Sequence, residues 1–134
     1  MKKNIELCNK RKKYLQSYLT MTTSIKVIEN LIQSLRKEHA EDIVYIENKK
    51  QYETVHEQIR NLTESLGTLL EEKQNLCEII LHDIEKMEQE TEKNLLILKY
   101  INGYTWEQIC EIMNYSLRQT YYIHNHALEH FSET

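Results

Sequence analysis

The chain has 134 residues, which suits one domain or a small domain with an extension, and 28% of them are charged, an ordinary soluble composition. It contains no proline and two glycines. Strand-bounding turn residues are therefore scarce, and we expect an all-α fold. No apolar run reaches the ~18 residues of a membrane span, and residues 1–13 lack the apolar stretch of a secretory signal, so we expect a cytoplasmic protein without membrane contact.

The net charge of −4 conceals a gradient along the chain. Residues 1–50 carry 11 Lys and Arg against 6 Asp and Glu, whereas residues 51–90 carry 3 against 10 and residues 91–134 carry 3 against 5. The C-terminal third is thus slightly acidic, which is unusual for a segment that binds phosphate. Cys8, Cys77 and Cys110 are widely spaced and form no CxxC pair, so we expect reduced thiols on apolar faces and neither a disulfide framework nor a zinc site.

Two long helical stripes precede the last third of the chain. Both alternate steps of four and three residues, the spacing of a heptad seam. The first comprises Tyr14, Tyr18, Met21, Ile25, Ile28, Ile32 and Leu35. The second comprises Val55, Ile59, Leu62, Leu66, Leu69, Lys73, Leu76 and Ile80, and widens through Leu70, Cys77, Leu81 and Ile84, which predicts more than one packing partner there.

The connection between the stripes is weakly marked. Residues 20–24 are rich in threonine and serine, which weakens helix propensity and makes a kink or break one alternative there. The seam is lost over residues 38–50, where the run Ile43–Ile46 has a strand-like composition, and we expect the chain to reverse there. Residues 1–90 are therefore predicted to form a long antiparallel hairpin. Pairing between two chains, as a homodimeric coiled coil, is compatible with the same seams.

Residues 91–134 are predicted to form a second domain of three short helices. The first spans residues 92–101, with Thr91 as its expected N-cap and Asn102–Gly103 as its stop. The second begins after Thr105 and the third after Ser116. Each of these two residues is followed three positions later by glutamine, Gln108 and Gln119, the spacing of a capping box.

The last helix has an apolar and a polar face. We expect Thr120, Ile123, Ala127, Leu128 and Phe131 to point inward, and Arg118, Tyr121, Tyr122, Asn125, His126 and Glu129 to point outward. A capped helix, the short turn Asn114–Tyr115 and a second capped helix predict a helix-turn-helix, whose second helix enters the major groove of DNA.

These residues resemble a known family. The run from Thr105 to Ser116, TWEQICEIMNYS, is similar to the second half of region 4 of sigma-70 factors. The run from Leu98 to Ile109, LKYINGYTWEQI, resembles phage regulators of the ArpU/RinA type more closely. The resemblance covers residues 91–131 and implies DNA binding and control of transcription. The chain departs from the family at Leu117, Arg118 and Tyr122, where sigma factors typically have Arg, Glu and Gln, and at Tyr122 and His126, where the phage proteins usually have arginine.

Two functions from different classes follow. The first is a DNA-reading transcriptional regulator, in which Arg118 binds guanine or phosphate instead of pairing with a local carboxylate. The second is a protein-interaction module that binds RNA polymerase or a sigma factor through the tyrosine-rich helix. The predicted nucleic-acid-binding residues are Ser116, Arg118, Gln119, Tyr121, Tyr122, Asn125 and His126.

Other chemistry is not indicated by the sequence. His124, His126 and His130 share the last helix, and their partial protonation would add positive charge to it, but no third metal ligand accompanies the spaced pair His126 and His130. The basic run of residues 10–13 could contact phosphate, although such runs are more often solvated helix faces. No nucleophile–base pair or glycine-rich phosphate loop is present, so we expect neither an enzyme nor a cofactor.

Overall fold

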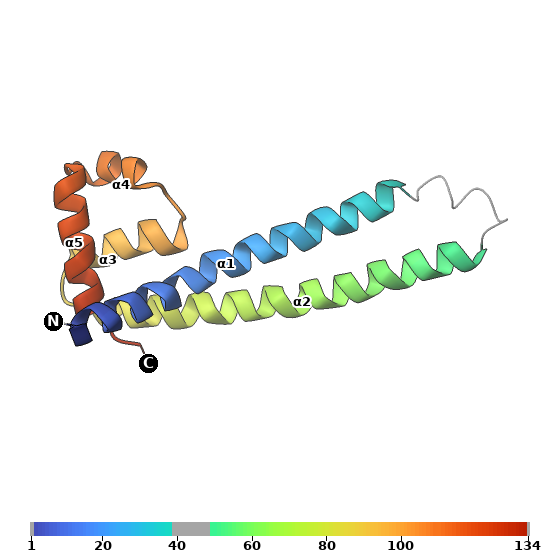
Figure 1. Cartoon of the computed structure of the whole chain (residues 1–134), viewed down its shortest axis with the longest axis horizontal. Coiled ribbons are helices and arrows are strands. Elements are labelled where there is room, and N and C mark those ends of the chain that lie inside the picture. The colour runs from blue at the N-terminus through green and yellow to red at the C-terminus, as the bar shows by residue number, and fades with distance from the viewer. Residues whose placement is uncertain (1, 39–48, 134) are drawn as a thin grey trace. The chain divides into compact units, whose positions relative to one another are not determined.

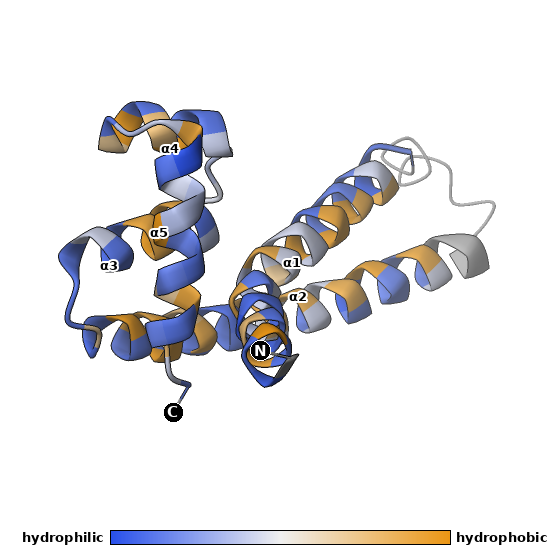
Figure 2. Cartoon of the chain, turned by 60° about the vertical axis from the view of Figure 1, so that its left-hand side comes forward, coloured by the Kyte–Doolittle hydropathy of each residue, from blue (hydrophilic) through white to orange (hydrophobic). Residues whose placement is uncertain are grey.

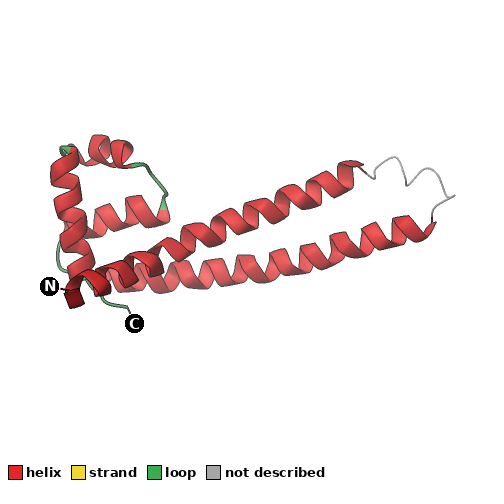
Figure 3. Ribbon diagram, in the orientation of Figure 1, coloured by secondary structure: helices red, strands yellow, loops and turns green. Residues whose placement is uncertain are grey.

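The computed structural model describes residues 2–38 and 49–133, and all of its regular elements are helices. Two long helices, α1 (Lys2–Glu38) and α2 (Lys49–Glu85), precede four short elements (Figure 1). These are α3 (Glu90–Leu96), the π-helical turn η2 (Ile97–Ile101), α4 (Trp106–Met113) and α5 (Leu117–His130). The described ranges hold no strand, which confirms the all-α class (Figure 3). No helix within them combines the length and apolar composition that crossing a membrane requires.

The chain separates into two compact units by packing. The head unit combines Met1–Thr20 with Gln74–Thr134, and the arm unit is Met21–Lys73. The domain boundary predicted after residue 90 was drawn from sequence motifs. The units are defined by packing instead, and they group residues 1–20 and 74–90 with the C-terminal helices. The start of α1 and the end of α2 both belong to the head unit. The short C-terminal helices therefore share one core with the start of the chain.

The arm unit is built on the predicted heptad seams. Its described seam residues are buried or half-buried, and Ile25 and Ile32 are the most enclosed. Figure 2 shows the apolar residues as bands along α1 and α2 between hydrophilic ones. The helix does not break at residues 20–24, because α1 continues through them. The Thr20 hydroxyl donates to the Gln16 carbonyl at 3.1 Å, and packing of the seam offsets the weak helix propensity.

The long helices run antiparallel, as the contacts within the head unit establish. Tyr18 of α1 contacts Cys77 of α2, and Tyr14 lies near Asp83, so residue numbers fall along α2 as they rise along α1. α1 ends at Glu38 and α2 begins at Lys49, as expected for a reversal between residues 38 and 50. The strand-like run at residues 43–46 lies outside the described residues.

The core of the head unit joins distant segments of the chain. The predicted widening of the α2 stripe is confirmed at its C-terminal end, where Ile84 packs with the short helices, whereas Leu70 stays 44% exposed. The buried apolar residues are Leu15 of α1, Ile80, Ile84 and Met87 from and after α2, Leu95, Leu96 and Tyr100 of α3 and η2, Ile109 of α4, and Ile123, Ala127, Leu128 and Phe131 from and after α5.

The start and stop of the first short helix differ from the prediction. α3 begins at Glu90 with Gln89 as its N-cap, so Thr91 lies inside the first turn and is not the cap. At the other end the helix widens into η2, where the Asn102 N–H donates to the Ile97 carbonyl at 2.9 Å. Gly103 then ends the helix with φ of 73°, as expected of a glycine stop.

The predicted caps are found at the starts of α4 and α5. At the start of α4 the Thr105 hydroxyl accepts from the Gln108 N–H, and the Gln108 side chain accepts from the Thr105 N–H, a complete capping box. At the start of α5 the Ser116 hydroxyl accepts from the Gln119 N–H at 3.1 Å. A full capping box would also have a hydrogen bond from the Ser116 N–H to the Gln119 side chain. That bond is not formed between these two described residues, so the capping box is only half present.

A tight turn and a polar contact join α4 to α5. Asn114 adopts the left-handed conformation (φ 60°, ψ 44°), and the Tyr115 N–H donates to the Cys110 carbonyl. The Cys110 thiol donates to the Thr120 hydroxyl at 3.3 Å, and that hydroxyl donates to the Ser116 carbonyl. The buried threonine is therefore satisfied, and it fixes the approach of the two helices.

Candidate nucleic-acid interface

The inward and outward faces of α5 are as predicted, with one exception. The five residues expected inside are all buried. His124 is also buried, at 5% exposure, and was not predicted to be inside. The remaining face is solvent-accessible, and its centre is a row of side chains at steps of four, three and four residues: Arg118, Tyr122, Asn125 and Glu129.

The predicted site residues take three different positions on α5. Arg118, Tyr122 and Asn125 lie on the exposed ridge. Ser116 and Gln119 are exposed at the N-terminal end of the helix, where the Ser116 hydroxyl is engaged in the cap. Tyr121 lies on one flank, its ring edge-on to that of Trp106 at 5.0 Å, and His126 lies on the other, 4.4 Å from the ring of Tyr122.

Arg118 is the only basic side chain among the four residues of the exposed ridge. It is exposed, and no carboxylate in the described part of the chain lies within ion-pair distance of it. The guanidinium is therefore available to an external partner.

The three histidines of α5 have distinct surroundings, so they do not form one cationic face. The Nδ1 atom of His126 lies 3.5 Å from a carboxylate oxygen of Glu129. The Nδ1 atom of His130 lies 2.9 Å from both carboxylate oxygens of Glu92. His124 is enclosed in the core, and burial lowers its pKa to about 4, with Lys12 and Lys99 adding to the effect. The expectation of partial protonation is therefore wrong for His124, which is neutral at pH 7.

His124 and Tyr100 form a buried polar pair. The Tyr100 hydroxyl and the Nε2 atom of His124 share a hydrogen bond of 2.6 Å. Burial also raises the pKa of Tyr100 far above its usual range. Because Tyr100 lies in η2 and His124 in α5, this bond links the π-helical turn to the back of the exposed helix.

The basic start of the chain packs on α5, which sequence reasoning did not predict. Nη1 of Arg11 donates to the carbonyls of Leu128 at 2.8 Å and Glu129 at 2.7 Å. These carbonyls lie in the last turn of α5 and have no partner within the helix. The ring of Tyr14 lies 6.2 Å from that of Phe131. One member of the basic run of residues 10–13 is thus a helix-capping residue.

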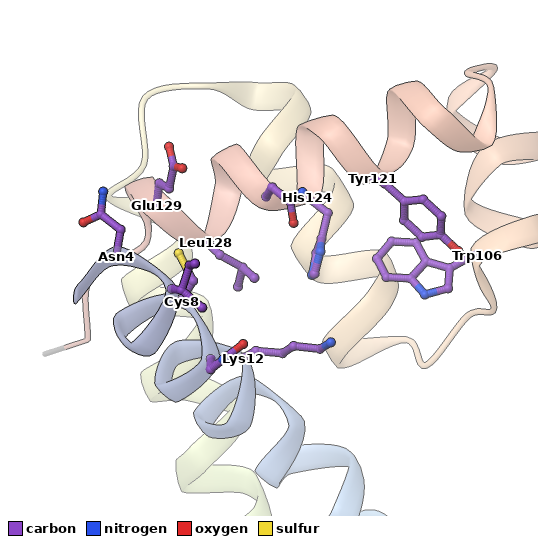
Figure 4. Close-up of a pocket in the computed structure, with 11 residues that line it drawn as sticks. Asn4, Cys8, Lys12, Trp106, Tyr121, His124, Leu128 and Glu129 are labelled. Atoms are coloured by element: carbon purple, nitrogen blue, oxygen red, sulfur yellow. The ribbon is translucent and has the colours of Figure 1, made fainter. Parts of the chain in front are cut away.

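An open cavity of about 660 Å³ lies between the start of α1 and the Tyr121 flank of α5 (Figure 4). The side chain of Lys12 extends toward His124 and Trp106. Lys99 of η2 lies 4.5 Å from the centre of the Trp106 ring. The lining residues are Asn4, Ile5, Cys8, Asn9 and Lys12 of α1, Trp106 of α4, and Tyr121, His124, Asn125, Leu128 and Glu129 of α5.

Comparisons with models of known protein families, with curated proteins and with solved structures find no match to this chain. Within residues 2–38 and 49–133, no three His, Cys, Asp or Glu side chains gather as metal ligands would. The candidate interface therefore rests on its own geometry.

Proposed function

We propose that this protein is a DNA-binding transcriptional regulator of the phage or mobile-element type. In this proposal α4 and α5 act as a helix-turn-helix related to sigma-70 region 4, and α5 enters the major groove of a promoter or operator. The observation that carries the proposal is the construction of α5, which has a fully packed inner face and an exposed polar ridge after a capped, tight turn.

The residues of the ridge suit different contacts with DNA. Arginine binds guanine through two parallel hydrogen bonds, and asparagine pairs with adenine in the same way, so Arg118 and Asn125 are the proposed base readers. Tyr121, Tyr122 and Gln119 would contact phosphates or sugars, and Ser116 would orient the N-terminal end of the helix. His126 would lie at the rim of this contact surface.

The location of the basic start of the chain supports this function. The slightly acidic balance of residues 91–134 opposes phosphate binding when that segment is considered alone. Residues 1–20, however, belong to the same compact unit and carry six Lys and Arg against one Asp or Glu. Arg11 fixes this cationic segment beside the last turn of α5, where it can attract the DNA backbone.

The arm unit offers a route to a two-fold symmetric regulator. A helix-turn-helix dimer binds two half-sites about 34 Å apart, so two weak modules together bind a paired operator. The long helices would supply the homodimer contact. Such a regulator would act in the cytoplasm, where the bacterial chromosome is accessible.

A selection from a random duplex pool, followed by a salt titration, tests the proposal. We expect an enriched duplex whose affinity falls steeply with salt. Replacement of Arg118 with alanine should reduce the preference for that duplex by about 1 to 3 kcal/mol. The matched control is Arg60→Ala, which removes an exposed arginine from α2 in the arm unit. Absence of enrichment and of binding at low salt would contradict the proposal.

A second candidate function is supported by exposed apolar side chains around the turn. Ile112, Tyr115, Leu117, Tyr121 and Tyr122 are each at least 40% exposed, on adjoining parts of α4, the turn and α5. Such a surface suits a helical partner such as RNA polymerase or a sigma factor. Binding of purified polymerase that is lost in Leu117→Ser but kept in Arg118→Ala would favour this function over DNA reading.

A further inference from the structure

The cavity beside α5 gathers positive charge without a matching carboxylate. Lys12 of α1 and Lys99 of η2 both act electrostatically on His124, and Lys12 also lowers the pKa of Lys99, after the larger effect of burial. Glu107 opposes this effect weakly, but within the described residues neither ammonium has an ion-pair partner. His124 does not add to this charge at pH 7, because burial lowers its pKa to about 4.

The remaining lining of the cavity suits an anion with several oxygens. Asn4 and Asn9 of α1 supply side-chain amides, and amide N–H groups donate to phosphate oxygens. Trp106 and Tyr121 form an aromatic wall beside them. Glu129 also lines the cavity, but its carboxylate lies 3.5 Å from His126 on the other flank of the helix. The lysine in the lining, a second lysine beside Trp106, two amides and one engaged carboxylate therefore favour a phosphate group.

The fold holds these groups in a fixed arrangement. Arg11 ties the α1 segment to the last turn of α5, one residue before Lys12. Two successive residues of the η2 turn contact two different helices. Lys99 lies over the ring of Trp106 in α4, and Tyr100 is hydrogen-bonded to His124 in α5. An α-helix widened to a π-helical turn often marks a functional site. Lys12 is thus positioned by the contact of its neighbour Arg11, and Lys99 by the bond of its neighbour Tyr100 and by its own contact with Trp106.

We propose that the cavity lined by Lys12, Trp106 and Tyr121, with Lys99 beside Trp106, is a phosphate-binding site that binds one backbone strand of the DNA while the ridge of α5 reads the groove. The inference rests on the proposed function for the source of the phosphate. The site itself requires only a phosphate group, so inorganic pyrophosphate can serve as a probe independent of DNA.

Trp106 provides the measurement. It is the only tryptophan of the chain and lines the cavity, with Lys99 over its ring, so its fluorescence reports occupancy. The full chain is titrated with inorganic pyrophosphate, and separately with the selected duplex, against NaCl of equal ionic strength. We expect a saturable emission change with both, weakened at least tenfold for pyrophosphate in Lys12→Gln and Lys99→Gln. Lys13→Gln, an exposed lysine of α1 that does not line the cavity, is the matched control.

The duplex arm adds a readout that a structural role would not change. Each site variant should lower the salt slope of duplex binding by about 1 without changing sequence preference, the converse of Arg118→Ala. If duplex binding persists but both site variants behave like Lys13→Gln, the site is refuted and the proposed function stands. If pyrophosphate binds through both lysines but no duplex binds, the site stands with a small phosphate ligand and the proposed function fails. No saturable change with either probe overturns the site.

Discussion

His124 links acidity to the stability of the head unit. Its pKa is about 4 in the folded chain against an ordinary value of 6.5, because the ring is buried and lies near Lys12 and Lys99. Between these values the unfolded chain binds more protons than the folded one. The contribution of His124 to stability is therefore complete above pH 6.5 and is lost as the pH falls toward 4.

We expect the free energy of unfolding to be lower at pH 5 than at pH 7, with a contribution from His124 on the order of 2 kcal/mol. His124→Gln keeps a hydrogen-bonding side chain for the Tyr100 hydroxyl and removes the titration, so its pH dependence should be smaller. His82→Gln, which changes an exposed histidine of α2, should retain the full dependence. Urea denaturation at both pH values, followed by Trp106 fluorescence, makes the comparison. Equal pH dependence in the wild type and His124→Gln would show that the buried histidine titrates normally.

Arg11 of α1 caps the last turn of α5 in the same chain. Arg11→Gln removes two charged hydrogen bonds to carbonyls that are partly accessible to water, so we expect a loss of about 1 to 2 kcal/mol of head-unit stability. Lys13→Gln removes the same charge from an exposed position and should change the stability by less than about 0.5 kcal/mol. Urea midpoints measured by Trp106 fluorescence test this, and equal midpoints would contradict the capping role.

At the scale of elements, the turn between α4 and α5 depends on one backbone conformation. Asn114 is left-handed, which glycine tolerates freely and alanine does not. Asn114→Ala should therefore cost about 1 to 2 kcal/mol, whereas Asn114→Gly should be close to neutral. Thermal denaturation of the two variants provides an internally matched pair. Should alanine and glycine prove equivalent, the turn does not adopt this geometry in solution.

Local signals predicted where α4 and α5 begin, and long-range contacts account for what the local signals missed. The caps at Thr105 and Ser116 and the stop at Gly103 depend on residues within four positions, so the sequence alone located them. The N-cap of α3 was misassigned to Thr91 because a threonine before a helical stripe is a common cap, but the N-cap is Gln89 and the helix starts two residues earlier than predicted. The widening into η2 accompanies contacts with Trp106 of α4 and His124 of α5. Both residues are distant in the sequence, so no local pattern reveals these contacts.

The candidate site was predicted in part for the same reason. The exposed side chains of α5 follow from helical periodicity, which placed Arg118, Tyr122 and Asn125 correctly on the outer face. The cavity and its lysines could not be predicted, because Lys12 reaches α5 only through the packing of residues more than a hundred positions apart. The basic run of residues 10–13 was the one available signal, and it did not indicate its partner.

At the scale of the whole molecule, the arm unit has apolar side chains that its own two helices leave uncovered. Val27 and Leu31 are one turn apart on α1 and are 60% and 46% exposed. We expect two arm units to pair through this face in a homodimer, because a two-helix seam alone buries little apolar surface. The double variant Val27→Gln, Leu31→Gln should be monomeric by sedimentation equilibrium, and Glu29→Gln should stay dimeric. A monomeric wild type at micromolar concentration would contradict this prediction.

The core of the head unit also has a kinetic consequence. Leu15 and Phe131 share this core, so the unit cannot be completed until chain segments separated by the whole arm unit meet. Closing so long a loop in an unfolded chain is entropically costly and slow. If the arm pairs first through its own seam, Tyr18 and Cys77 are brought together and the remaining search becomes short. The arm unit would then act as an intramolecular template for folding of the head unit. Substitutions that weaken the seam of the arm unit would slow formation of the head-unit core, although the arm unit contributes no side chain to that core.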